Sequence, residues 1–126
     1  MPRRPTAAKA TDPEDFLPLP ASVMNILVAL AGGEKHGYAI MGEVEELSGG
    51  TVTMGPGTLY GSIKRMIEQG LLEETAERPD PSLDDQRRRY YRLTALGAQV
   101  GAAEHARLRR LVDAADLRRL GLGGVA

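Results

Sequence analysis

The chain lacks cysteine and tryptophan altogether and has a single phenylalanine in 126 residues. Without cysteine it can form neither a disulfide nor a thiolate zinc site, and this composition fits the reducing cytoplasm, where we expect the protein to act. Because aromatic side chains are scarce, the core has to be built mainly from Leu, Val, Ile, Ala and Met. The only two histidines, His36 and His105, stand far apart in the sequence, so we expect no metal site and no cofactor.

Long hydrophobic runs are also missing. No stretch approaches the roughly 18 apolar residues that a membrane span needs, and the opening residues contain no apolar run, so we expect neither a membrane span nor a signal peptide. Apolar residues still make up 42% of the chain, which suits one compact domain with an appendage. The net charge of −1 means that any contact with nucleic acid depends on where the positive charges lie.

The sequence also lacks the residues of a catalytic site. It has no cysteine nucleophile, and its two histidines do not stand close together in the sequence. The glycines at 55, 57 and 61 do not fit the dinucleotide-binding motif G-x-G-x-x-G, and no P-loop ending follows them. We therefore expect that the protein is not an enzyme.

The most informative stretch is residues 54–72, MGPGTLYGSIKRMIEQGLL. Gly55 suits a helix cap, Pro56 the first helical position and Gly70 the left-handed residue after the last turn. Apolar residues at helical spacing form a buried stripe of Leu59, Ile63, Met66 and Ile67. The opposite face is small, polar and basic, and consists of Gly57, Thr58, Gly61, Lys64 and Arg65, with Tyr60 at its edge. A helix with such a face fits the major groove of DNA, which is about 12 Å wide.

Two helices are predicted before this one. Residues 21–31 are apolar around most of the helix circumference, so this helix should lie at the centre of the fold. Residues 35–48 form a second helix with an acidic outer face. Its first residues, His36, Gly37 and Tyr38, stand where free backbone N–H groups attract an anion such as a phosphate, although a capping role is the alternative for His36. A turn then leads to the helix from Pro56, which makes a helix-turn-helix.

After Gly70 the pattern changes from helical to alternating. Residues 71–76 and 88–93 are predicted strands, and the polar segment between them forms a loose tip, so the pair makes a β-hairpin or wing. The returning strand opens with Arg87, Arg88 and Arg89, which we expect to lie along DNA phosphates. The alternative is a solvated strand face whose arginines pair with acids of the tip.

Thr94 is a suitable N-cap for a last helix that no proline interrupts before about residue 120. Such a helix is about 39 Å long, which exceeds what a small domain can cover, so we expect its apolar stripe to pack against a second copy. The predicted interface consists of Leu96, Val100, Ala103, Leu108, Leu111, Val112 and Ala115. The arginines at its outer positions are solvated or pair with the partner's acids, among them Glu104. The predicted division is a flexible arm (1–16), a DNA-binding domain (17–93), a dimerisation helix (94–120) and a flexible tail (121–126).

Four motifs occur in order along the chain: HGYAI, PGTLYGSIKRM, EQGLLEE and RRRYYRLTALG. Through them, about residues 19–110 resemble the PadR-type transcriptional regulators, in the branch with a single short C-terminal helix. The resemblance implies a mainly α fold with a small β-hairpin, a winged helix-turn-helix. It also implies a homodimeric regulator, usually a repressor, bound to double-stranded DNA with inverted half-sites. The family's recognition helix falls on residues 56–69, with Thr58, Tyr60 and Lys64 at DNA-facing positions, and its wing strand on residues 87–91.

The effector and the alternative function stay open at the level of the sequence. Some members of the family release DNA when a small aromatic ligand binds, but this chain lacks the tryptophan with which they stack it, so any small-molecule effector is unknown. The alternative function is a winged-helix module for protein–protein interaction without sequence-specific DNA binding. Such a module would present an apolar or acidic recognition face, whereas Lys64, Arg65 and the arginine triplet are basic.

Overall fold

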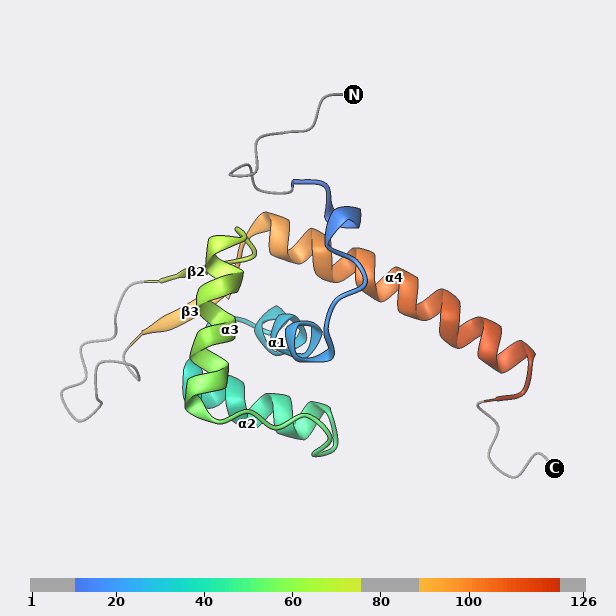
Figure 1. The fold of residues 1–126 in the computed structure, drawn as a ribbon, viewed down its shortest axis with the longest axis horizontal. Helices are drawn as coiled ribbons and strands as arrows, with labels where there is room; N and C mark the ends of the chain where they lie inside the picture. Colours follow the sequence, from blue (N-terminus) through green and yellow to red (C-terminus); the bar gives the residue numbers. More distant parts are fainter. Residues whose placement is uncertain (1–10, 76–88, 121–126) are drawn as a thin grey trace.

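The computed structural model describes residues 11–75 and 89–120. The elements follow in the order η1 (Pro13–Phe16), α1 (Ala21–Ala31), β1 (Lys35–His36), α2 (Gly37–Leu47), α3 (Pro56–Glu68), β2 (Leu72–Glu74), β3 (Tyr90–Leu93) and α4 (Ala95–Leu117). In Figure 1, α1 lies between α2 and α4, and α4 runs outward from the body. The predicted fold class, mainly helical with a small antiparallel sheet, is confirmed.

The core forms around α1, as its apolar sequence predicts. Helix α1 packs against α2, α4 and β3. The buried side chains of the three central helices are almost all aliphatic: Ile26, Leu27, Ala29, Leu30, Ile40, Val44, Leu59, Ile63 and Met66. Among the described residues, Tyr91 is the one buried aromatic side chain. None of the helices in this part of the chain has the length and apolarity that a membrane crossing requires.

Helix α3 begins and ends where its sequence predicts. Gly55 is its N-cap and Pro56 its first residue. Gly70 has a φ of 84°, and the backbone N–H of Leu71 donates to the carbonyl of Met66 at 2.9 Å, which closes the last turn. The stripe that holds α3 to the domain consists of Leu59, Ile63 and Met66. Ile67 packs at the edge of this core.

The sheet has three strands rather than the two of a simple hairpin. Its order is β1-β3-β2, with both pairs antiparallel. Residues 35–36 were predicted as the start of the second helix, but they pair with β3 instead, through Lys35 opposite Tyr91 and His36 opposite Tyr90. The helix therefore begins at Gly37. This pairing between distant residues fixes the beginning of α2 against the base of the wing.

The end of the predicted N-terminal arm is structured. Residues 13–16 form the short helix η1, capped by the Asp12 carboxylate at 3.0 Å from the Glu14 amide, and η1 packs against α4. A little further on, the Leu19 amide donates to Glu104 Oε2 at 3.0 Å. Glu104 is only 1% exposed and needs such donors, because a buried carboxylate without partners is costly. Residues 1–10 lie outside the described part.

Glu104 was predicted to pair with a second copy, but its partners lie in the same chain. Arg107 donates to it from Nε at 2.6 Å and from Nη2 at 2.9 Å. The hydrogen bonds from Arg107 lower the pKa of Glu104 below that of an ordinary glutamate, with a further contribution from the Leu19 amide. The carboxylate therefore ties the segment before α1 to the middle of α4.

The first half of α4 is covered by its own domain. Thr94 caps the helix by accepting from the Gly97 amide at 2.9 Å, and a side chain at Gly97 would collide with the carbonyl of Leu71. Val100 is fully buried in its own domain, so the prediction that it meets a second copy is wrong. Leu96 is partly buried against the same core. The helix ends at Leu117, slightly before the predicted end.

Candidate nucleic-acid interface

The outer face of α3 is basic and accessible. Gly57, Thr58, Lys64 and Arg65 are exposed, and Gly61 is half-buried. Lys64 forms no ion pair with any residue in the ranges 11–75 and 89–120. Arg65 Nη2 lies 3.4 Å from the hydroxyl of Ser62, a buried polar residue that the sequence did not single out. These side chains project from a helix whose position the core determines, so their charge is presented on a rigid element.

Tyr60, at the edge of this face, directs its hydroxyl toward α2. Its hydroxyl has almost no exposed surface. Its ring lies against Gly37 at the start of α2, where any side chain at position 37 would collide with the phenol. Gly37 is itself buried. The expectation that Gly37 meets DNA is therefore corrected, because this residue is buried where α2 packs against α3. Tyr60 as a whole is half-buried, so its contact with DNA stays a prediction.

The beginning of α2 is occupied by its own cap. His36 Nδ1 accepts from the Ala39 amide at 3.1 Å, so the alternative capping role is the one observed. The imidazole also packs edge-on against Tyr90 of β3, with ring centroids 5.5 Å apart and planes at 85°. Tyr38 is half-buried. This end of α2 is thus built into the base of the sheet, and one of its free N–H groups is already satisfied.

The wing and α3 meet across a cleft of about 400 Å³. Lys64 and Glu68 of α3 lie on one side of the cleft, and Glu74 and Arg89 on the other. Arg89 Nε lies 3.8 Å from Glu74 Oε2, an acid of strand β2 rather than of the tip, so the pairing of the arginines with tip acids stays a prediction. Arg87 and Arg88 lie outside the described residues. Arg92, which was not predicted as a site residue, pairs with Glu73 across the sheet at 2.6 Å.

Tyr91 forms part of the floor of this cleft and belongs to the core. It is 4% exposed, and burial, aided by the negative charge of Glu74, raises its pKa above that of an ordinary tyrosine. The phenol therefore stays neutral, and the charge of the cleft comes from the lysine, arginine and glutamate side chains. Within the described residues, no group of histidines and carboxylates has the arrangement of a metal site.

Several known proteins are similar to this chain. Residues 26–103 match the sequence profile of the Transcriptional regulator PadR-like family. An uncharacterised 37.1 kDa protein in transposon TN4556 of Streptomyces fradiae is 35% identical over 88 residues. That match covers 70% of this chain but only 23% of the Streptomyces protein, so the chain spans about a quarter of the length of this relative.

Solved structures share the fold. A PadR family transcription regulator from Clostridium difficile superposes with a TM-score of 0.64 at 22% identity, covering 78% of this chain and 97% of that one. Bacillus subtilis PadR, in complex with operator DNA, superposes with a TM-score of 0.57 at 23% identity, covering 72% of this chain and 47% of that one. The matched residues, 26–103, contain α2, α3, the described wing strands and the first turns of α4, and the chain therefore belongs to the PadR-like family of transcriptional regulators.

Proposed function

We propose that the protein is a homodimeric, sequence-specific DNA-binding repressor. The observation that carries this proposal is the outer face of α3, where Thr58, Lys64 and Arg65 are exposed on a helix held rigidly by its buried stripe. Its first turn presents only Gly57 and Thr58 beside the capping residues, and this narrow leading end suits insertion into a major groove about 12 Å wide. Family membership and the operator DNA bound by Bacillus subtilis PadR support the same assignment.

The roles of the interface residues follow from their positions. Thr58, Gly61, Lys64 and Arg65 meet base edges and give sequence preference, whereas phosphate contacts give affinity and orientation. The phosphate contacts come from the wing arginines, residues 87–89, and from His36 and Tyr38, which are half-buried at the start of α2. Each α3 of the dimer enters one half-site, so the operator has inverted symmetry, with half-sites about one helical turn apart. Occupation of such a site blocks transcription sterically.

The decisive experiment is selection of binding sequences from random DNA, followed by gel shifts with the selected site. Lys64→Ala and Arg65→Ala should each weaken binding by roughly 5- to 150-fold, equivalent to about 1–3 kcal/mol, and relax the preference at one base pair. Both variants should melt like the parent, because their side chains lie off the buried stripe. Arg118→Ala, which removes an exposed arginine near the end of α4, is the matched control and should bind DNA normally.

The result also separates the proposed function from a protein-interaction module. A module of that kind would give no sequence-dependent shift and no enriched motif. If the wild type selects a motif but both α3 variants bind it unchanged, a different face of the protein reads the DNA.

A further inference from the structure

A small pocket lies between the segment before α1 and the end of α3. Its volume is about 290 Å³, close to the lower end of the range for small-molecule sites, about 300–1,000 Å³. The apolar part of its lining includes Phe16, Leu19, Val23, Met66 and Leu71. Four of these five side chains are aliphatic, so the pocket suits the apolar body of a small, flexible ligand.

The wall of the pocket that precedes α1 is held in place from behind. The Leu19 amide donates to the buried Glu104 carboxylate at 3.0 Å. Helix η1, which contains Phe16, packs against α4. On the opposite wall, Met66 is 1% exposed and belongs to the core. The pocket is therefore formed before a ligand enters it, as small-molecule sites usually are.

The polar part of the lining favours an anion. It consists of Ser22, Ser62, Arg65 and Gln69. Arg65 is the one charged side chain among the described residues that line the pocket. The pocket also adjoins the beginning of α1, where the N-cap residue Pro20 supplies no side-chain hydrogen bond to the first amides, and such amides carry partial positive charge. A guanidinium can hold a carboxylate through two parallel hydrogen bonds.

The guanidinium of Arg65 lies between this pocket and the outer face of α3. Its Nη2 is 3.4 Å from the hydroxyl of Ser62, which is longer than an ordinary hydrogen bond of about 2.7–3.2 Å. Its Nη1 is 3.8 Å from the position that a Cβ on Gly61 would take, and Gly61 belongs to the outer face. Arg65 forms no ion pair with any residue in the ranges 11–75 and 89–120. Its charge is therefore available to either side.

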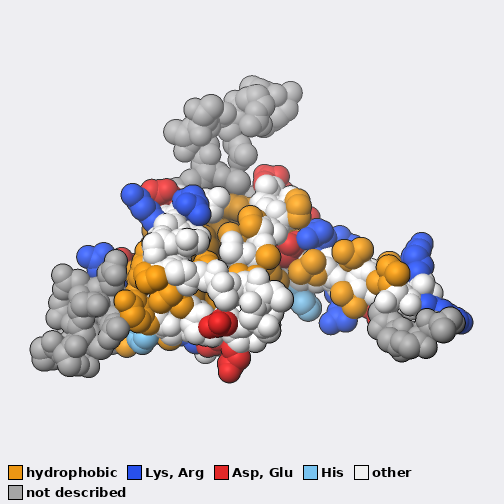
Figure 2. Space-filling view, turned by 60° about the horizontal axis from the view of Figure 1, so that its bottom comes forward, with side chains coloured by type: hydrophobic (Ala, Val, Ile, Leu, Met, Phe, Trp, Pro, Cys, Tyr) orange, Lys and Arg blue, Asp and Glu red, His pale blue; other side chains and the backbone are white. Residues whose placement is uncertain are grey.

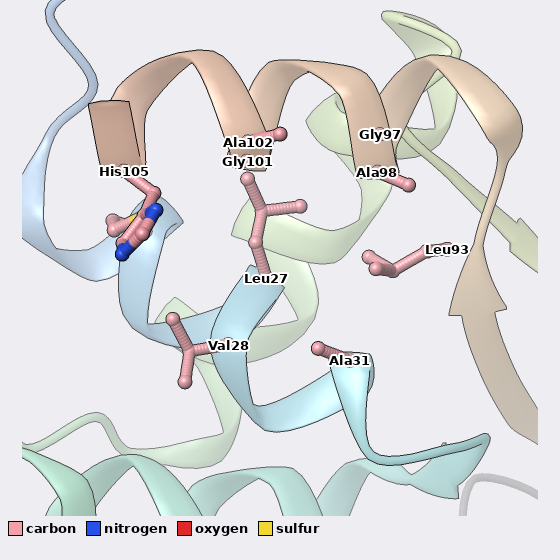
Figure 3. Close-up of a pocket in the computed structure, with 10 residues that line it drawn as sticks. Leu27, Val28, Ala31, Leu93, Gly97, Ala98, Gly101, Ala102 and His105 are labelled. Atoms are coloured by element: carbon pink, nitrogen blue, oxygen red, sulfur yellow. The ribbon is translucent and has the colours of Figure 1, made fainter. Parts of the chain in front are cut away.

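The other apolar surfaces lack this combination. The groove between α1 and α4 is apolar apart from His105, and its described lining contains neither lysine nor arginine (Figure 3). Hydrophobic side chains also follow the projecting end of α4 (Figure 2). Leu111 is 61% exposed there, so side chains of that surface enclose little of a small molecule.

We propose that the pocket beside α3 binds a small aliphatic carboxylate, which acts as an effector. The carboxylate binds Arg65 and accepts from the Ser62 hydroxyl, and the hydrocarbon chain packs on the apolar lining. While the ligand is bound, the guanidinium is held on the pocket side and cannot reach a base edge. This inference rests on the proposed function and names the chemistry of its effector. Because the coupling is reciprocal, operator DNA and the carboxylate weaken each other's binding by the same factor.

Calorimetric titration of the full chain with octanoate tests the pocket without DNA. Octanoate should bind with a dissociation constant no weaker than about 1 mM. Octanamide, which has the same chain without the charge, and inorganic phosphate, which has charge without the chain, should each bind at least tenfold more weakly. Equal affinities for octanoate and octanamide, or no binding of octanoate, would overturn the proposal.

Two variants of α3 locate the charge that octanoate requires. Arg65→Ala should weaken octanoate binding at least tenfold. Lys64→Ala is the matched control, because Lys64 is a neighbouring cation that lines the cleft on the wing side of α3 instead, and it should bind octanoate like the wild type. Equal effects of the two substitutions would show that octanoate responds to general charge, and would overturn the assignment to Arg65.

The absence of tryptophan from the chain allows a fluorescent reporter at the pocket. Gln69 lines the pocket and is exposed, with helical φ and ψ values that other residues adopt freely. In Gln69→Trp, octanoate should change the emission of the single indole. Glu68→Trp is the control, since Glu68 lines the cleft on the wing side and its indole should not respond. A response from Glu68→Trp alone would place octanoate in the other cleft and overturn the proposal.

Gel shifts with the selected DNA site test the coupling. Saturating octanoate should weaken DNA binding of the wild type by the same factor as the Arg65→Ala substitution, roughly 5- to 150-fold. It should leave the DNA binding of Arg65→Ala unchanged, because that variant has no guanidinium to withdraw. Octanoate that binds the wild type without weakening its DNA binding would overturn the effector role. A wild type that selects no DNA motif would instead overturn the proposed function, and the calorimetric comparison would still decide whether the pocket binds the carboxylate.

Discussion

Replacement of Glu104 tests whether the segment before α1 is held by one buried carboxylate. In Glu104→Ala, the Leu19 amide loses its acceptor at 3.0 Å and Arg107 loses both of its hydrogen bonds. A buried donor without a partner costs about 1–3 kcal/mol, and removal of the methylene and carboxylate groups leaves a small cavity. We therefore expect the free energy of unfolding to fall by about 2–4 kcal/mol. Glu104→Gln keeps the shape and one oxygen, so it should lose about half as much.

The pH dependence distinguishes loss of charge from loss of shape. Because Arg107 lowers the pKa of Glu104 in the folded state, the carboxylate contributes stability above its pKa in the unfolded chain, about 4.3. This contribution is lost as the pH falls through the lower pKa of the folded state. The difference in stability between wild type and Glu104→Gln should therefore be constant near neutral pH and shrink below about pH 4.3.

The assay is thermal or urea unfolding at a fixed protein concentration, since any dimer makes the melting temperature depend on concentration. Glu46→Ala serves as the control, because Glu46 is exposed on α2, and it should change stability by less than about 0.5 kcal/mol. The reasoning is refuted if Glu104→Ala unfolds like the control. It is also refuted if the difference in the free energy of unfolding between wild type and Glu104→Gln is as large at about pH 3 as at about pH 7.

Three further predictions concern the interface. Gly37→Ala should destabilise the protein by about 1–3 kcal/mol through its collision with the ring of Tyr60, whereas Gly57→Ala, with open space around it, should not. Tyr60→Phe should keep the DNA sequence preference, because the hydroxyl it removes is buried; a changed motif in the selected DNA would show that Tyr60 moves outward on binding. Replacement of the arginines at 87–89 by alanine should weaken all DNA sequences alike and flatten the salt dependence, by about 0.9 in slope for each phosphate that the wing no longer neutralises. An unchanged slope would leave Arg89 as a partner of Glu74 alone.

The elements that sequence reasoning placed correctly are those whose signals are local. Gly55, Pro56 and Gly70 mark the ends of α3 because each suits one backbone conformation. Thr94 likewise caps α4 through its own side chain. Such signals act within a few residues, so they can be recognised without knowledge of the rest of the fold.

The corrections come from contacts between distant parts of the chain. Strand β1 exists because residues 35–36 pair with β3, more than fifty positions later. Tyr60 turns inward because Gly37, on the preceding helix, leaves room for its ring. Glu104 is buried because the Leu19 amide, 85 positions away, reaches its carboxylate. The helical periodicity of α3 or α4 alone does not identify any of these distant partners.

In helix α4 the apolar pattern was recognised correctly, but the dimer interface predicted from it was partly wrong. The sequence stripe took apolar residues at helical spacing as a single face, so it joined Leu96 and Val100, which face the helix's own domain, to Leu111 and Val112, which are exposed. A helix that packs against its own domain first and extends past it afterwards needs two apolar faces that diverge along its length. The stripe also left out glycine, yet Gly101 lines a groove between α1 and α4. The exposed Leu111 and Val112 are therefore the part of the predicted interface that the helix's own domain does not cover.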